Sequence, residues 1–271
     1  MNNMNNVPKT VLVVGATGSI GRLVVDEALR QGHVVRALVR TTNKARQVNA
    51  QAHVIIDDVT RPDTLRDAVD GVDAIIFTLG TDGLGKAGAE SVDYGGVRNV
   101  LKAIGSRNVR IALMTSIGVT NRAGSYNRTT EAHDWKRRSE RLVRASGLQY
   151  TIVRPGWFDY NTPDQHRLVF LQGDRRQAGD SSDGVVARRQ IAQVLVNSLG
   201  SDQASRKTFE LVAEAGPAPD DFYALFARLD ADPEGSPDGV RDLPNMPLAD
   251  EPQRVRDDFA KVAAHRIAGP A

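Results

Sequence analysis

Short apolar runs alternate with amphipathic stretches along most of this chain. The apolar runs cover residues 11–14, 33–39, 53–56, 73–79, 109–114 and 149–154, with a weaker one at 207–212. Between most of them, apolar positions recur with the period of a helix, at 19–31, 62–70, 89–105, 131–146 and 185–199. This alternation predicts right-handed strand-helix-strand units. We therefore expect an α/β fold with a doubly wound, mainly parallel sheet and helices on both of its faces.

The pattern changes after about residue 200. One more strand is expected there, then a helix over 219–229, and then the Pro-, Gly- and Asp-rich run DADPEGSPDGVRDLPNMPLADEPQ. Residues 201–271 hold 14 acidic and 8 basic side chains. Such a composition is typical of irregular structure. We expect a main domain over 1–215 and a small C-terminal helical cap with an acidic tail over 216–271.

Three glycines, Gly15, Gly18 and Gly21, follow the first apolar run and open the first helix pattern. In this context the first glycine permits a tight turn, the second lets a pyrophosphate approach the backbone, and the third allows close helix-strand packing. The N–H groups expected to face the phosphates, with the positive end of the helix dipole behind them, belong to Thr17, Gly18, Ser19, Ile20 and Gly21. The main domain is therefore predicted to be a Rossmann-type dinucleotide-binding domain.

The end of the second apolar run bears on which dinucleotide is bound. A site for NAD places Asp or Glu there to accept from the ribose 2′-hydroxyl, whereas a 2′-phosphate needs a cation. This chain has Arg40 at that position and no acid beside it. The sequence favours NADP over NAD, the alternative being that Arg40 is an ordinary surface arginine.

Two further strand ends supply candidate contacts to the cofactor. After the third run, Asp58 can accept from the adenine amino group while the Val59 N–H donates to the ring; equally, Asp58 or Thr60 can cap the helix that begins near Pro62. After the fourth run, small residues leave room for the ribose and nicotinamide, or form an ordinary turn. These residues are Thr78, Leu79 and Gly80.

The amino-acid composition of the chain excludes several kinds of chemistry. The chain of 271 residues has no cysteine, which excludes disulfides and thiolate catalysis, and its five histidines show no metal-ligand spacing, so no metal site is expected. No apolar run has the length of a membrane span, and the start MNNMNNVPKT lacks the pattern of a secretion signal, so we expect a cytoplasmic protein. Residues 1–150 hold 21 basic and 14 acidic side chains, which suits either an anionic ligand or a solvated surface.

Six motifs carry a family resemblance. They are GATGSIGR (15–22), VRALVR (35–40), DDVT (57–60), MTSIGV (114–119), HDWKRRSERLVRASGL (133–148) and YTIVRPGWF (150–158). In this order they resemble the atypical branch of the short-chain dehydrogenase/reductase superfamily, the NAD(P)H-binding group that includes biliverdin reductase B and the NmrA-like proteins. The resemblance covers about residues 10–215 and specifies no substrate.

The resemblance implies roles for particular residues. Ser116 matches a serine that hydrogen-bonds a substrate carbonyl, and Lys136 matches a lysine that binds the nicotinamide ribose. A lysine so placed can also lower the pKa of a neighbouring acid. The loop that closes over the nicotinamide corresponds to Pro155, Gly156 and Trp157.

One departure from the family pattern affects the chemistry. Members that transfer hydride carry a tyrosine four residues before the lysine, on the same helix face, but this chain has Ala132 there. His133 titrates near neutral pH and is one candidate substitute as proton donor; Tyr126 is another. Solvent or the substrate itself is the third.

The same helix pattern carries a basic stripe, namely Arg137, Arg138, Arg141 and Arg144. Because acidic residues are interspersed and no aromatic residues alternate with the arginines, we expect a solvated face and no nucleic-acid partner. Trp135 and Leu142 would form the buried side of the helix or part of a dimer interface. The expected partner is a small-molecule substrate, with no membrane contact, in a monomer or a homodimer.

The sequence supports two functions from different classes. The first is an NADPH-dependent reductase of a small organic substrate that works without the tyrosine general acid. The second is a non-catalytic NADP(H) sensor whose partner binding changes with redox state, an idea prompted by Ala132. An isomerase or dehydratase ranks last, because relatives of that kind need the missing tyrosine.

Overall fold

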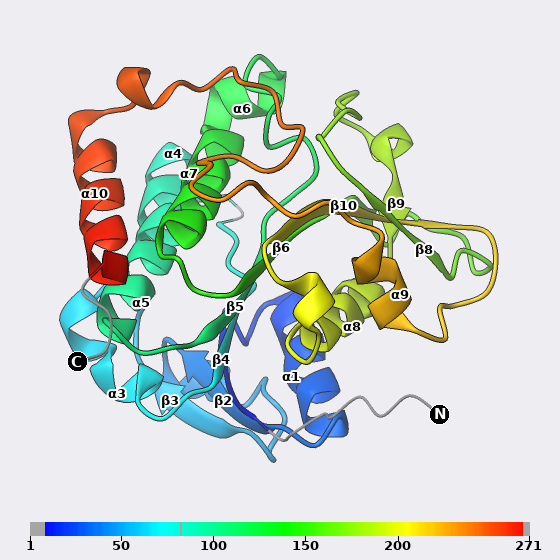
Figure 1. Cartoon of the computed structure of the whole chain (residues 1–271). Coiled ribbons are helices and arrows are strands. Elements are labelled where there is room, and N and C mark those ends of the chain that lie inside the picture. Colours follow the sequence, from blue (N-terminus) through cyan, green and yellow to red (C-terminus); the bar gives the residue numbers. More distant parts are fainter. Residues whose placement is uncertain (1–8, 82, 268–271) are drawn as a thin grey trace.

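A twisted sheet with helices on both faces forms the centre of the computed structural model (Figure 1). The structure describes residues 9–81 and 83–267, with the side chains of 265–267 left out. Within these ranges the sheet has ten strands, in the order β3-β2-β1-β4-β5-β6-β10-β9-β7, with β8 also paired to β10. The strands are β1 (Thr10–Val14), β2 (Val34–Val39), β3 (His53–Ile56), β4 (Ala74–Phe77), β5 (Arg110–Met114), β6 (Tyr150–Pro155), β7 (Trp157–Phe158), β8 (Arg167–Leu171), β9 (Val185–Val186) and β10 (Lys207–Glu214).

Seven of the described strands, β3-β2-β1-β4-β5-β6-β10, run parallel. Their carboxyl ends therefore meet at one edge, and the strand order reverses between β1 and β4, where such sheets bind ligands. Only the short strands β8 and β9 pair antiparallel with β10 among the described residues. The predicted doubly wound, mainly parallel sheet is confirmed.

Two helical layers cover the sheet because β1 is apolar on both of its faces. Val11 and Val13 pack toward α1 and α8, whereas Leu12 and Val14 pack toward α5 and α7 (Figure 1). The described helices are α1 (Ser19–Arg30), α2 (Thr42–Ala45), α3 (Arg66–Val69), α4 (Gly85–Gly88), α5 (Gly95–Ile104), α6 (Ser125–Thr130), α7 (Ala132–Ala145), α8 (Arg188–Ser198), α9 (Phe222–Ala227) and α10 (Gln253–Ile267).

The structure refines several expected elements. The helix expected over 62–70 is a 3-10 turn, Pro62–Thr64, followed by α3, and the one expected over 89–105 begins with a π-helical turn, Ala89–Tyr94, before α5. The weakly predicted strand at 207–212 is β10, whose residues are buried from Lys207 to Ala213. β8, α6 and α10 have no counterpart in the sequence prediction.

Residues 230–251, which we call the C-terminal strap, run across α7 and lead to α10 (Figure 1). The strap is irregular apart from the 3-10 turn Leu248–Asp250. α10 then packs on α5 and α7, with Val255 fully buried in the core on that face. The acidic segment is thus held against the sheet's helical layer along its length.

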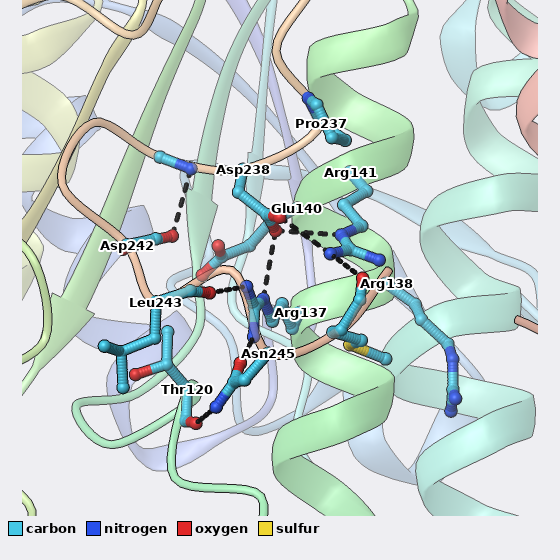
Figure 2. Close-up of polar contacts among 12 residues, drawn as sticks. Thr120, Arg137, Arg138, Glu140, Arg141, Pro237, Asp238, Asp242, Leu243 and Asn245 are labelled. Carbon is cyan, nitrogen blue, oxygen red and sulfur yellow. Dashed lines mark hydrogen bonds and ion pairs between the residues drawn. The ribbon is translucent and has the colours of Figure 1, made fainter. Parts of the chain in front are cut away.

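The strap overturns the expectation of a solvated face on α7. Arg137 and Arg141 are 0% and 1% exposed, and both bind Asp238, at 3.0 and 2.7 Å (Figure 2). Glu251 pairs with Arg138 at 2.7 Å and with Arg141 at 3.2 Å. Two similar pairs extend the cluster, Arg144 with Asp232 and Arg154 with Asp242. The prediction was wrong because the counter-charges come from residues about 100 positions later in the chain.

Candidate functional site

The glycine loop lies at the carboxyl end of β1. Gly15 has φ of 93°, and a Cβ on it would stand 2.8 Å from the Thr78 carbonyl oxygen. A Cβ on Gly21 would stand 2.1 Å from the Gly15 carbonyl oxygen. Gly18 has a less crowded position, because its added Cβ would approach only the Gly15 oxygen, at 3.3 Å. Gly15 and Gly21 therefore allow close packing, and Gly18 leaves the entrance to α1 open.

The start of α1 presents free N–H groups. Gly18 is the N-cap and supplies no side-chain cap, and the first helical bond runs from the Arg22 N–H to the Gly18 oxygen at 3.1 Å. Within the part of the chain that the structure describes, no backbone acceptor serves the N–H groups of Thr17, Ser19, Ile20 and Gly21. Such a cradle, with the helix dipole behind it, is suited to a pyrophosphate.

Arg40 directly follows β2 at the same edge of the sheet. Its side chain is exposed and has no hydrogen bond or ion pair with any described residue. Arg36, also in the VRALVR motif, is directed elsewhere, since its guanidinium donates to the Asp70 carbonyl before β4. Arg40 is thus the arginine of this motif whose side chain has no partner among the described residues.

The turn after β3 gives Asp58 and Val59 different environments. The Asp58 carboxylate accepts from the Thr60 N–H and from the Thr60 hydroxyl, both at 2.9 Å, and so starts the turn that leads to Pro62. The Val59 oxygen accepts from Asn99 Nδ2 at 2.8 Å, while its N–H has no acceptor among the described residues. The expected helix cap by Asp58 or Thr60 is wrong, because Arg61 is the N-cap of the 3-10 turn at Pro62 and no side chain caps it. The Val59 N–H is free to bind an adenine ring.

The residues after β4 mainly pack against the glycine loop and against α5. The Thr78 N–H donates to the Val14 oxygen at 2.9 Å, and its hydroxyl lies 3.3 Å from the Gly15 oxygen, which holds the glycine loop against β4. Leu79 is buried against Gly96 of α5, where an added Cβ would stand 2.8 Å from Leu79 Cδ1. Gly80 alone of these three predicted contacts is exposed.

Lys136 on α7 is oriented by a carboxylate that the sequence did not point to. Its Nζ lies 3.2 Å from Asp93 Oδ1, and Asp93 Oδ2 accepts from the Thr81 hydroxyl at 3.0 Å. Asp93 is buried in the π-helical turn before α5, a kind of turn that is frequent at functional sites. This chain of contacts connects α7 to the loop after β4.

Several buried polar atoms have no hydrogen-bond partner among the described residues, including Nε1 of Trp135 on α7. Two of them belong to predicted site residues, namely the Ser116 hydroxyl after β5 and Nδ1 of His133 on α7. His133 lies against the loop after Ser116, because a Cβ on Gly118 would stand 3.5 Å from its Cε1. Burial lowers the pKa of His133 and so disfavours its charged form. Both atoms are free to bind a polar group of a ligand.

The position of the missing tyrosine lies inside the core. Ala132, the first residue of α7, is buried together with Trp135 in the cluster between the sheet and α5. Tyr126, on α6, is exposed and its ring centroid lies 5.2 Å from that of His133. The structure therefore places the rings of Tyr126 and His133 side by side, with Tyr126 at the protein surface.

The loop after Ser116 is fixed by Asp174, a second residue that the sequence did not point to. Its carboxylate accepts from the Gly118 N–H at 2.6 Å and from the Thr120 N–H at 2.7 Å. Asp174 is fully buried, and its own N–H donates to Glu210 at 3.1 Å. Burial raises the pKa of Glu210 to about 8. A buried carboxylate from the segment after β8 thus anchors the segment that carries Ser116.

The segment after β6 is more ordered than a loop. The Gly156 N–H donates to the Leu211 oxygen and the Trp157 N–H to the Gly184 oxygen, both at 2.9 Å. A Cβ on Gly156 would stand 2.4 Å from the Gly184 oxygen. Pro155 ends β6, and Trp157 begins β7 with its ring partly exposed and edge-on to Tyr160 at 6.2 Å. Backbone pairing therefore fixes Pro155, Gly156 and Trp157 beside the carboxyl end of β6.

The described residues show neither a membrane-spanning helix nor a metal site. None of the helices there is both long and apolar enough to span a membrane. No group of three or more His, Asp or Glu side chains in residues 9–81 and 83–264 is arranged to hold a metal ion.

Comparison with known proteins agrees with this geometry. A family model described as NAD(P)H-binding matches residues 15–202. Photosystem II assembly factor Ycf39 of Synechocystis is 27% identical over 222 residues, covering 81% of this chain and 67% of that protein. Sanguinarine reductase of Eschscholzia californica is 26% identical over 267 residues, covering 81% of this chain and 96% of that protein.

A solved structure supports the same fold. The short-chain dehydrogenase/reductase from Veillonella parvula in complex with NADP superposes with a TM-score of 0.58 at 18% identity, covering 79% of this chain and 99% of that one. The predicted NAD(P)H-binding Rossmann domain is confirmed, since the family model spans more than half of the chain. This chain belongs to the NAD(P)H-binding family.

Proposed function

We propose that the protein is an NADPH-dependent reductase of a small carbonyl or conjugated carbonyl compound. The observation that carries the proposal is the buried Ser116 hydroxyl without a partner, on a segment that Asp174 anchors beside the cofactor cradle. An unsatisfied buried hydroxyl costs free energy, so its retention is explained by a ligand oxygen that it binds. The relative named sanguinarine reductase supports the same reaction class.

The residues present fit a nicotinamide dinucleotide. The free N–H groups of Thr17, Ser19, Ile20 and Gly21 would hold the pyrophosphate, whereas the Gly18 N–H already donates to the Gly15 oxygen at 3.0 Å. Arg40 would hold the 2′-phosphate, and the Val59 N–H the adenine. Lys136, fixed by Asp93 at 3.2 Å, would donate to the hydroxyls of the nicotinamide ribose. Arg40 makes NADP the preferred cofactor in this proposal, because a guanidinium attracts a 2′-phosphate and no carboxylate stands beside it.

NADPH, when bound, would supply a hydride to the substrate carbon and become NADP⁺, and the carbonyl oxygen would take a proton. Ser116 donates a hydrogen bond to that oxygen and so stabilises the negative charge that develops on it. Lys136 adds a positive charge nearby. Because burial disfavours the charged form of His133 and Ala132 has no hydroxyl, we assign the proton to water that enters at the exposed Tyr126.

The test is a kinetic comparison of three proteins. NADPH oxidation is followed at the nicotinamide absorbance band with aldehydes, ketones and quinones as acceptors. Ser116→Ala should lower kcat/KM about 100-fold and leave NADPH affinity unchanged, because the lost hydrogen bond acts in the transition state. Ser106→Ala, at an exposed position beyond α5, is the control and should match the parent protein. NADPH binding without oxidation by any acceptor would count against the reductase.

A redox sensor is the second candidate, and Ala132 favours it. The residue that delivers the proton in hydride-transferring relatives is absent, and its position is buried. The relative named an assembly factor adds support. A sensor should bind NADPH tightly without turnover, and it should lose a partner captured in the presence of NADPH when Arg40 is replaced by alanine. Turnover with any acceptor at a rate that Ser116→Ala abolishes would exclude a purely sensing role.

A further inference from the structure

A cavity of about 820 Å³ is lined by β8, by Glu210 of β10 and by Leu225 of α9. Its volume falls in the range of small-molecule sites, which is roughly 300–1,000 Å³. Ile117, the residue after Ser116, lines one end, and its N–H donates to the Pro155 oxygen at 3.0 Å. The cavity therefore reaches the segment to which we assign the substrate carbonyl.

The charged lining is mainly basic. Five arginines line the cavity, namely Arg167, Arg175, Arg176, Arg228 and Arg241. Arg241 is ion-paired with Asp230, Arg167 pairs with Glu214 outside the cavity, and Arg176 donates to the Asp183 carbonyl. Arg175 and Arg228 are exposed and have no acceptor in the described part of the chain. These two guanidinium groups are available to an anion.

The acidic lining does little to offset this charge. It consists of Asp220, Asp230 and Glu210. Asp230 is paired with Arg241, which leaves exposed Asp220 as the one unpaired carboxylate among the described lining residues. Glu210 is buried and paired with Arg154 at 3.2 Å, so a guanidinium outside the lining offsets its charge. An anion in the cavity would thus meet an excess of positive charge.

The rest of the lining is apolar apart from Gln172. Phe170 of β8 stacks on Phe209 with ring centroids 4.3 Å apart, and it contacts Phe226 of α9 at 5.5 Å. Val169, Leu225 and Leu229 continue this surface. A ligand that fits would have an apolar body and an anionic end, because apolar walls favour the first and a guanidinium the second.

We propose that this cavity binds the substrate, and that the substrate is an apolar organic acid whose carboxylate is held by Arg175 and Arg228 while its reducible carbonyl reaches Ser116. This inference rests on the proposed reductase function, because the bound acid is a substrate only if the protein reduces it. The binding of an apolar anion can be measured without turnover.

The binding test uses two fluorescent probes of similar shape. 8-Anilinonaphthalene-1-sulfonate is apolar and anionic, and N-phenyl-1-naphthylamine is its neutral counterpart. Arg175→Glu with Arg228→Glu should raise the Kd of the anionic probe at least tenfold and that of the neutral probe less than twofold. Arg66→Glu with Arg189→Glu is the matched control, since it changes the net charge equally at exposed arginines outside the cavity. Equal weakening by both double variants would overturn the proposal. An unchanged NADPH affinity and unfolding temperature would show that the variants are folded.

The kinetic test separates this inference from the proposed function. With carboxylate-bearing acceptors, Arg175→Glu with Arg228→Glu should raise KM at least tenfold with kcat little changed; uncharged acceptors should show no such effect. If the parent protein oxidises NADPH and this variant behaves like the control, the reductase stands and the cavity assignment fails. If no acceptor is reduced but the anionic probe keeps its arginine dependence, the anion site stands and the reductase fails.

Discussion

Replacing Asp238 by alanine removes one carboxylate that serves two buried guanidinium groups. Asp238 accepts from Arg137 Nε at 3.0 Å and from Arg141 Nε and Nη2 at 2.8 and 2.7 Å. Arg137 keeps Asn245 and the Leu243 carbonyl as acceptors, so only part of its binding is lost. Removing one partner of a buried pair costs about 3–5 kcal/mol of unfolding free energy, and Asp238, at 19% exposed, falls near the lower end of that range.

The matched control is Glu214→Ala, which breaks the surface pair between Arg167 and Glu214. These side chains are 55% and 41% exposed, so the change should cost less than about 1 kcal/mol. Urea unfolding, followed by tryptophan fluorescence, should give a lower midpoint for Asp238→Ala with an unchanged slope. Hydrogen exchange of the C-terminal strap should also become faster. A loss for Asp238→Ala no larger than that for Glu214→Ala would refute the view that the strap's carboxylates are stabilising counter-charges.

Three further predictions concern the cofactor cradle and the buried carboxyl. Arg40→Ala should weaken NADP binding at least about tenfold, or 1.4 kcal/mol, in a titration, and Arg40→Asp should shift preference toward NAD; equal NADP affinity in parent and variant would reject the 2′-phosphate role. Gly21→Ala should weaken NADPH binding at least about tenfold and lower the unfolding temperature, because its Cβ would stand 2.1 Å from the Gly15 oxygen; an unchanged Kd would contradict the close packing. Glu210→Gln should gain stability over the parent protein between pH 4.5 and about 8, since burial raises the folded-state pKa to about 8 and the contribution of the protonated group is lost as pH rises through that window. A stability difference between these two proteins that is constant with pH, measured by urea unfolding, would contradict a raised pKa.

The central part of the fold could be predicted because parallel strands buried on both faces appear as continuous apolar runs. β1 and β4 are fully buried strands of this kind, and the helices between strands show their own period. β8 is not a continuously buried strand of this kind. Its first residue, Arg167, is exposed, Leu168 is buried, and Val169 is only partly buried. Its pairing with β10 depends on a long-range contact rather than on a local pattern.

The residues of the candidate site likewise divide into those that local sequence could predict and those that it could not. The glycine loop and Arg40 could be located because their chemistry follows from position next to a strand end. Asp93 and Asp174 were missed because each acts through a partner 43 to 56 residues away, which no local spacing reveals. The arginines of α7 were misjudged for the same reason, since a charged stripe looks solvated until its distant partners are known.

The long separation between the arginines of α7 and the strap has a consequence for biosynthesis. Asp238 follows Arg137 by 101 residues, and Glu251 follows Arg138 by 113. At about 5–20 residues per second, a ribosome needs roughly 5–20 seconds to add the last acidic partner after the helix has been made. During that interval α7 can settle on the sheet only with its guanidinium groups still hydrated, so its final docking has to wait until the strap has been made. A nascent chain stalled before residue 232 would therefore carry a completed glycine loop on a domain whose helical layer cannot yet close.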